Sequence, residues 1–336
     1  MSSSSLEFVD IGVNLTDGMF KGKYHGKKAH QPDLENVLKR AKDAGVVAQM
    51  VTAGSVSEVK QVLDLVKRYE NEDAGLYATA GIHPTRTSGV GEGTKYLNDL
   101  RRFLDQEAIT KNPKGKIVAI GECGLDYDRL QFSKAEVQKE HFPHHLQLAK
   151  EYKLPLFLHC RAAQEDFIKI IQKEVDEIAE ACENDATRND THKRRRIGVA
   201  HCHTGTVEEM QQLIKQGLFI GFTGCSFKEE EGIRLAKEVP LEYLMLETDA
   251  PWCDLRQTHA SAPLLKRFVE KHPDLSALYS PASVKKEKWE AEKQVKSRNE
   301  PCAIGNVAAV IAEAKGIDIS IVVKAARENT KFLFTI

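Results

Sequence analysis

The sequence lacks the features that would assign it to several large protein classes. Its 336 residues contain seven cysteines but no CxxC pair, which argues against a disulfide framework or a thiolate zinc site of common spacing. No apolar run approaches the length of a membrane-spanning helix, about 20 residues. Basic residues number 48 and acidic residues 49, a formal charge of −1, so no global attraction to nucleic acid or membranes is expected. Any anionic partner would need a local patch.

Several catalytic motifs are also missing. The histidines do not follow the H-E-x-x-H spacing of helical metalloproteases, and no G-x-S-x-G turn of a serine hydrolase is present. After Met-Ser-Ser-Ser-Ser the chain enters an apolar strand without a signal core. Because the sequence shows neither a signal segment nor paired cysteines, we expect a cytoplasmic protein. A nuclear location is the alternative.

Eight short apolar runs alternate with segments of helical period. They occupy residues 8–14, 46–54, 76–83, 117–126, 154–161, 197–203, 218–226 and 244–252. Their lack of polar–apolar alternation is typical of strands buried on both faces. Capping boxes at Ser55 and Thr206 predict helix starts between runs. Eight strand–helix units favour one α/β domain over residues 1–336, a (β/α)₈ TIM barrel. An open doubly wound sheet shows the same alternation, but no glycine-rich phosphate turn follows its first strand.

Two polar stretches interrupt this rhythm. Residues 183–196 are predicted to form an exposed insertion, in which "KRRR" is either a solvated loop or a nuclear address. Residues 253–300 are long, charged and poor in apolar period. Because they follow the eighth strand, we expect a long loop region over the C-terminal mouth of the barrel, where such folds build their active sites.

Ionisable residues stand at the ends of five predicted strands. They are His83, Glu122, His159, His201 and Asp249. In a barrel these ends meet at the C-terminal mouth, where imidazoles and carboxylates can hold one or two divalent ions for metal-assisted hydrolysis. A structural polar ring is the alternative.

Side-chain alternation refines this arrangement. A period of two points Val118, Ile120 and Glu122 to the barrel interior. It turns Cys160 and Cys202 away from the interior, and we interpret both as packed structural thiols.

The segments around these residues resemble one known family. They are "FVDIGVNLTDGMFKG", "GIHPTR", "VAIGECGLDYDRLQF", "LPLFLHCR", "HCHTGT", "IGFTGCS", "LETDAPW" and "RNEPC", between residues 8 and 302. In this order they resemble the TatD family of metal-dependent deoxyribonucleases, and particularly its eukaryotic branch. The resemblance implies a TIM barrel, a binuclear metal site and 3′-to-5′ cleavage of DNA phosphodiesters.

The resemblance also implies residue roles. Glu122 would bridge two metals and His159 and His201 would complete the ligands of one ion. Asp249 would bind the other ion and help to orient the attacking water. His83 would lie beside the scissile phosphate.

The first strand departs from the family pattern. Many members carry D-x-H-x-H there, whereas Gly12 and Asn14 replace the two histidines in this sequence. The ion at Asp249 would then have mostly oxygen around it, which favours Mg²⁺, with Mn²⁺ and Zn²⁺ as alternatives. His203 stands where the family more often has Phe or Ser. It could reach the site, or serve a supporting or surface role.

Several residues are candidates for substrate binding. Lys285, Lys286, Trp289 and Arg298 follow the last strand, where cations could contact phosphates and an aromatic ring could stack a base. Glutamates interleave this cluster, so a solvated helix with Trp289 packed on the barrel is equally consistent. Arg161 could bind a phosphate or pair with Glu247.

The expected function is therefore a metal-dependent deoxyribonuclease acting on single-stranded DNA or duplex ends. Two alternatives remain at this stage. Related barrels use similar ligands to hydrolyse small amides or esters, and the missing first-strand histidines would also suit a non-catalytic binding module. The oligomeric state is not indicated.

Overall fold

A computed structural model describes residues 6–70, 75–91 and 94–336. The serine-rich start that supports the predicted location, residues 1–5, lies outside these ranges. Eight parallel strands follow one another around a single sheet in chain order. They are β1 Phe8–Val13, β4 Val46–Val51, β5 Leu76–Ala80, β6 Ile117–Asp126, β7 Leu156–Arg161, β8 Gly198–Ala200, β9 Phe219–Phe222 and β10 Leu244–Leu246.

The sheet closes into a barrel between β1 and the segment that follows β10. The amide of Asp249 donates to the carbonyl of Gly12 at 2.8 Å, and the amide of Asn14 donates to the carbonyl of Ala250 at 2.7 Å. These bonds place the end of the last strand beside the end of the first. The predicted TIM barrel is confirmed.

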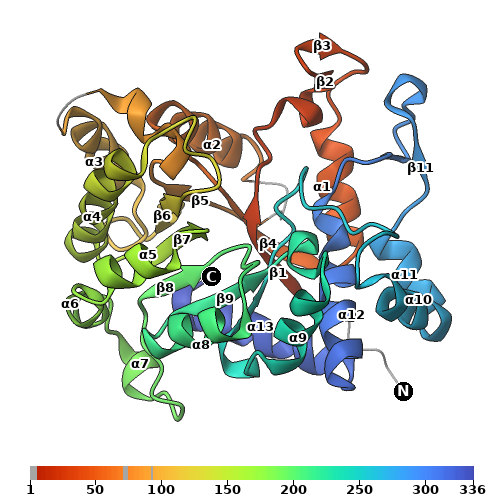
Figure 1. The fold of residues 1–336 in the computed structure, drawn as a ribbon. Coiled ribbons are helices and arrows are strands. Elements are labelled where there is room, and N and C mark those ends of the chain that lie inside the picture. The colour runs from red at the N-terminus through yellow and green to blue at the C-terminus, as the bar shows by residue number, and fades with distance from the viewer. Residues whose placement is uncertain (1–5, 71–74, 92–93) are drawn as a thin grey trace.

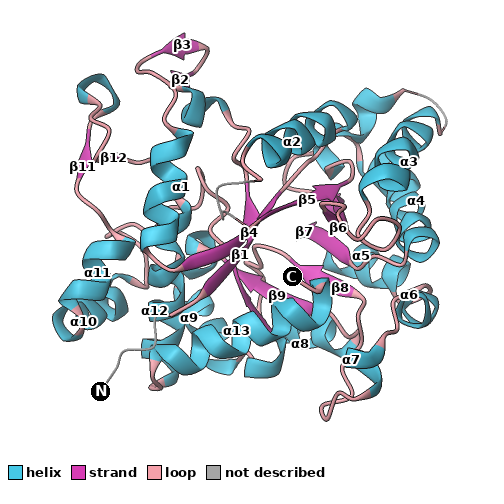
Figure 2. Cartoon of the chain, turned by 180° about the vertical axis from the view of Figure 1, so that it is seen from behind, coloured by secondary structure: helices cyan, strands magenta, loops and turns pink. Residues whose placement is uncertain are grey.

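Helices surround the strands in both views of the chain (Figures 1 and 2). They are α1 Leu34–Asp43, α2 Val56–Arg68, α3 Lys95–Glu107, α4 Ala135–Tyr152, α5 Gln164–Ile171, α6 Val175–Ala181, α7 Asp185–Arg188, α8 Val207–Lys215, α9 Glu230–Glu238, α10 Ala262–Lys271, α11 Pro273–Tyr279, α12 Ile304–Lys315 and α13 Ile319–Phe334. Thr206 and Glu209 form the predicted capping box at α8. At α2, Ser55 accepts from the Glu58 amide, but the Glu58 carboxylate accepts from Gly54 instead of completing the box.

The apolar core has two layers. The barrel interior is filled by side chains that include Val9, Ile11, Met50, Val118, Phe157, Val199, Phe219 and Met245, and a larger cluster lies between strands and helices. The end of α13 joins the interior cluster through Phe332, Leu333 and Phe334, whose side chains are at most 7% exposed. The interior is therefore packed, which leaves polar chemistry to the barrel's ends.

The predicted alternation along β6 is wrong in one respect. Val118 packs in the barrel interior, but Ile120 belongs to the outer layer. The pairing of β6 with β7 shifts register between Ile120 and Cys123. Such irregularities re-aim side chains, and here Glu122 faces the site although Ile120 faces outward.

The basic run within 183–196 is not a solvated loop. Arg194 contacts Asp190 and Asn329, and Arg195 pairs with Asp176. Arg196 is 6% exposed and donates to the carbonyls of Leu333 and Cys182. The three arginines therefore tie the segment to the rest of the fold.

The expectation of a long loop over the mouth is largely wrong for 253–300. This segment contains α10, α11 and a short parallel pair, β11 Ser283–Val284 with β12 Gln294–Val295. Helices α10 and α11 pack beside α12 at the periphery (Figures 1 and 2). A second short pair, β2 Lys23–Tyr24 with β3 Lys27–Lys28, forms a hairpin after β1.

Among the described residues, no helix is long and apolar enough to cross a membrane.

Candidate active site

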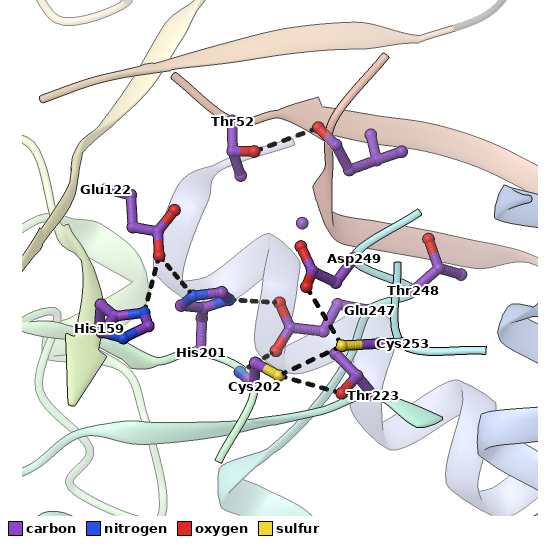
Figure 3. A network of polar contacts seen from close by, with 12 residues as sticks. Thr52, Glu122, His159, His201, Cys202, Thr223, Glu247, Thr248, Asp249 and Cys253 are labelled. Carbon is purple, nitrogen blue, oxygen red and sulfur yellow. Dashed lines mark hydrogen bonds and ion pairs between the residues drawn. The ribbon is translucent and has the colours of Figure 1, made fainter. Parts of the chain in front are cut away.

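Glu122 lies at the centre of three histidines. Its Oε1 atom is 2.8 Å from Nε2 of His201 and 2.9 Å from Nδ1 of His159 (Figure 3). The same atom is 3.3 Å from Nε2 of His83. Glu122 and His159 lie within β6 and β7, whereas His201 directly follows β8 and His83 lies a few residues beyond β5. The Thr85 amide donates to Nδ1 of His83, which leaves the proton on Nε2 facing Glu122. The structure thus brings these four predicted residues together.

The cluster is electrostatically polarised. Burial opposes the charge of Glu122, but the nearby His83 and His201 outweigh it, and its pKa lies well below the ordinary range. Burial likewise opposes protonation of His201, but Glu122 and Glu247 raise its pKa well above the usual value. For His83 burial dominates and lowers the pKa. Glu122 is therefore held in its ionised form, and the protonated form is favoured at His201 but not at His83.

Two buried carboxylates support the histidines from behind. Oδ2 of Asp126 lies 3.2 Å from Nε2 of His159, and Oε2 of Glu247 lies 3.3 Å from Nδ1 of His201. Their side chains are 1% and 0% exposed. A carboxylate behind a histidine fixes the ring and raises its basicity as a metal ligand. Sequence reasoning missed both roles, although Asp126 is part of the "GECGLD" run.

Glu247 explains the departure of the first strand from the family pattern. A Cβ atom at Gly12 would lie 2.4 Å from Oε2 of Glu247, and one at Gly221 would lie 2.3 Å from its Oε1. Two glycines therefore make room for this carboxylate, which also accepts from the Cys202 amide. A first-strand histidine at position 12 would occupy the same space. The alternative prediction that Arg161 pairs with Glu247 is wrong, because the Glu247 carboxylate contacts His201 and accepts from the Cys202 amide instead.

Asp249 is held on the other side of the site. Asn14 donates to its Oδ1 at 2.8 Å, and Asn14 in turn accepts from Thr52 at 2.7 Å. The Cys253 thiol donates to its Oδ2 at 3.2 Å (Figure 3). Burial raises the pKa of Asp249 to about 6, although His201 opposes the shift. Asn14 thus positions Asp249, and a sulfur atom contacts it.

The donor set fits a divalent ion. One ligand atom each from Glu122, His159 and His201 lies within 4.8 Å of the others, and Cys202, Asp249 and Cys253 form a second such group. Imidazole and carboxylate donors suit Zn²⁺ and other transition ions. Mostly oxygen was expected around Asp249, and the structure adds two thiols, Cys202 and Cys253, within 4.8 Å of its carboxylate. The interpretation of Cys202 and Cys160 as structural thiols stays a prediction. The Cys202 thiol lies 3.1 Å from the Thr223 hydroxyl and 3.9 Å from the Cys253 thiol, whereas the Cys160 thiol donates to Gln164 at 3.6 Å and packs against the apolar core.

A cleft of about 520 Å³ adjoins these residues. Its lining includes Arg161 and His203, each two residues beyond a site histidine, and Lys228. His203 is 4% exposed and its Nε2 has no hydrogen-bond partner. The lining also includes Glu209, Glu229 and Glu231, so the cleft carries no net positive charge. Arg161, Lys228 and the unpartnered imidazole nitrogen still offer local contacts to an anionic group. We call this the Arg161 cleft.

The other predicted substrate residues lie apart from the cleft. Arg298 is 1% exposed and pairs with Asp33 and Glu300, so its predicted contact with substrate is wrong. Trp289 is half-buried, donates to Asp33 at 3.0 Å and stacks on His30. Lys286 lies over the Tyr24 ring, and Lys285 is exposed. This region joins the β2–β3 hairpin to the last loop.

Comparisons with known proteins identify the family of this chain. The family model described as TatD related DNase matches residues 9–335. The chain belongs to the TatD family. It is 36% identical to a protein of Schizosaccharomyces pombe named deoxyribonuclease Tat-D, over 97% of this chain and 95% of the relative. It is 38% identical to a Pantoea protein named 3′-5′ ssDNA/RNA exonuclease TatD, over 74% of this chain and 82% of the relative.

Solved TatD-like structures share the fold closely. An Entamoeba histolytica hydrolase of the TatD family superposes with a TM-score of 0.82 at 34% identity, covering 99% of both chains. A Saccharomyces cerevisiae protein described as an uncharacterized amidohydrolase superposes with a TM-score of 0.84 at 32% identity, covering 98% of this chain and 100% of that one. As a member of the TatD family, the protein is a hydrolase that acts on ester bonds.

Proposed function

We propose that the protein is a metal-dependent deoxyribonuclease that removes nucleotides from the 3′ end of single-stranded DNA or of duplex ends. The convergence of Glu122, His159 and His201 on one point, beside a cleft that Arg161 and Lys228 help to line, is the observation that carries this proposal. A ssDNA/RNA exonuclease name among the relatives supports the polarity and the unpaired substrate. The absence of a charge excess in the whole chain makes a local phosphate site necessary.

The ligand residues would divide the work as follows. Glu122, His159 and His201 would hold a divalent ion, and Asp249 would hold a second. Bound there, such ions acidify water and neutralise charge on a phosphoryl oxygen. Asp126 and Glu247 keep the two histidine rings oriented for binding.

Other side chains would act on the DNA itself. The Nε2 proton of His83 faces the site and would donate to a non-bridging phosphate oxygen. Asp249 would accept a hydrogen bond from the attacking water and so orient it. Arg161 and Lys228 would bind the adjacent phosphate, and His203, in the wall of the same cleft, would form a hydrogen bond with the DNA. Lys285, Lys286 and Trp289 would contact a more distant part of the strand.

The test uses one oligonucleotide labelled at either end. With Mg²⁺, Mn²⁺ or Zn²⁺ added to the metal-free protein, a 5′ label should give a descending ladder and a 3′ label should give a mononucleotide at once. The Glu122→Ala variant should lose both products, and Glu140→Ala, an exposed carboxylate on α4, should retain them. Activity that survives Glu122→Ala, or hydrolysis of small esters or amides with DNA left intact, would overturn the proposal.

A further inference from the structure

Three side chains outside the Glu122 cluster converge on a second point. The Sγ atoms of Cys202 and Cys253 are 3.9 Å apart, and the Sγ of Cys253 is 3.2 Å from Oδ2 of Asp249 (Figure 3). A third thiol, Cys225, interacts electrostatically with Cys253. The three cysteines come from the ends of three different strands, after β8, β9 and β10. Cys160, by contrast, donates to Gln164 and packs against the apolar core.

We propose that Cys202, Asp249 and Cys253 form a thiolate metal site for a soft or borderline divalent ion such as Zn²⁺. On binding, each thiol would give its proton to solvent and its sulfur would bond to the ion, with no oxidation of either. Two sulfurs and one carboxylate are the ligands of zinc-type sites rather than of Mg²⁺. Three protein ligands leave a fourth position for water or substrate, as in catalytic zinc sites.

The separations between the ligand atoms match such a site. Around a tetrahedral zinc with metal–sulfur bonds of about 2.3 Å, two sulfurs lie roughly 3.8 Å apart and a sulfur and an oxygen roughly 3.6 Å apart. The corresponding distances here are 3.9 and 3.2 Å. The third pair, Cys202 and Asp249, lies within 4.8 Å, so the three ligand atoms are close enough together to share one ion.

The backbone holds all three ligands in an uncommon conformation. The φ angles are +47° at Cys202, +53° at Asp249 and +54° at Cys253. Left-handed backbone is rare for residues that carry a side chain and often marks a functional site. All three residues are also half-buried, which leaves access for an ion.

The turn after β8 links this position to the Glu122 cluster. His201 faces Glu122, while the next residue, Cys202, faces Cys253 and Asp249. One dipeptide thus contributes a ligand to each of two neighbouring positions. Since Glu247 occupies the space of a first-strand histidine at Gly12, thiols would supply the donors that the first strand cannot.

The test is titration of the reduced, metal-free protein with Co²⁺ and Cd²⁺, read by the thiolate-to-metal charge-transfer absorption. We expect a band that saturates with one ion per chain. Cys253→Ser should abolish it and Cys202→Ser should weaken it. Cys160→Ser is the matched control, because Cys160 also follows a site histidine, and it should leave the band unchanged.

A second measurement needs no variant. Zn²⁺ should protect Cys202 and Cys253 of the wild-type protein from alkylation, as located by peptide mass spectrometry, and leave Cys160 equally reactive with and without metal. Absence of the absorption band, its persistence in Cys253→Ser, or alkylation of both thiols in saturating Zn²⁺ would overturn the proposal. Because these signals report metal–sulfur bonds rather than turnover, they do not depend on whether the protein cleaves DNA.

Discussion

At the scale of single residues, Glu122 has a chemical rather than a packing role. Its side chain contacts three histidines and belongs to neither apolar cluster. We therefore expect metal-free Glu122→Ala to keep its fold, with a melting temperature within a few degrees of the wild type, because no apolar contact is lost. Circular dichroism during heating measures this. Cooperative unfolding at room temperature would instead make Glu122 a structural residue.

The carboxylates behind the histidines should tune metal affinity. Asp126→Asn and Glu247→Gln preserve shape but remove the charge that orients His159 and His201, so each should weaken divalent-metal binding about 10- to 100-fold. Competition with a chromophoric chelator measures the affinity. Asp128→Asn is a suitable control, since Asp128 is exposed and two residues from Asp126. Equal affinities in all four proteins would contradict the positioning role.

At the scale of elements, the segment around Arg298 docks the last loop onto α1 and the β1 loop. Arg298 donates to Asp33 and Glu300, and Arg40 of α1 also pairs with Glu300. Arg298→Ala would leave two buried carboxylates with fewer partners, and should lower the free energy of unfolding by about 3–5 kcal/mol. Urea denaturation of the metal-free protein measures the loss.

Arg161 should behave in the opposite way. It lines the cleft beside the site, so Arg161→Ala should weaken single-stranded DNA binding about tenfold or more by removing a charged phosphate contact. The free energy of unfolding of Arg161→Ala should differ little from that of the wild type. Fluorescence anisotropy with Glu122→Ala as the inactive background measures binding without cleavage. If Arg298→Ala weakened binding and Arg161→Ala did not, the assignment of the two arginines would be reversed.

At the scale of the whole molecule, the order of strands and helices could be predicted from the sequence. Which side chains contact one another could not. Continuous apolar runs reveal buried parallel strands, and their polar ends revealed Glu122 and its histidines. Alternation did not anticipate the contact of Cys202 with Cys253, because β8 ends at Ala200 and strand periodicity does not extend beyond it. The contact of Glu247 with Gly12 arises only when the first and last strands meet. Arg298 was misassigned because a basic side chain in a charged segment gives no sign of burial.

The stability of the whole molecule should depend on the neutral form of His145. This residue of α4 is 1% exposed; its Nε2 accepts from the Ile82 amide at 3.1 Å, and its Nδ1 faces the His141 carbonyl at 3.1 Å. Burial lowers its pKa to about 4. The unfolded chain, with an ordinary histidine pKa of about 6.5, therefore takes up the proton first as pH falls.

The sign of the effect follows from this difference. The contribution of neutral His145 to the free energy of unfolding is fully present above pH 6.5 and is lost as pH falls towards 4. At about 1.36 kcal/mol per pKa unit, the loss is about 3 kcal/mol. His145→Gln keeps an acceptor for the Ile82 amide but cannot titrate. Urea denaturation of both metal-free proteins at pH 7.5, 6, 5 and 4 should give a difference in unfolding free energy that shifts in favour of the variant as pH falls. A pH-independent difference would show that His145 does not couple protonation to folding.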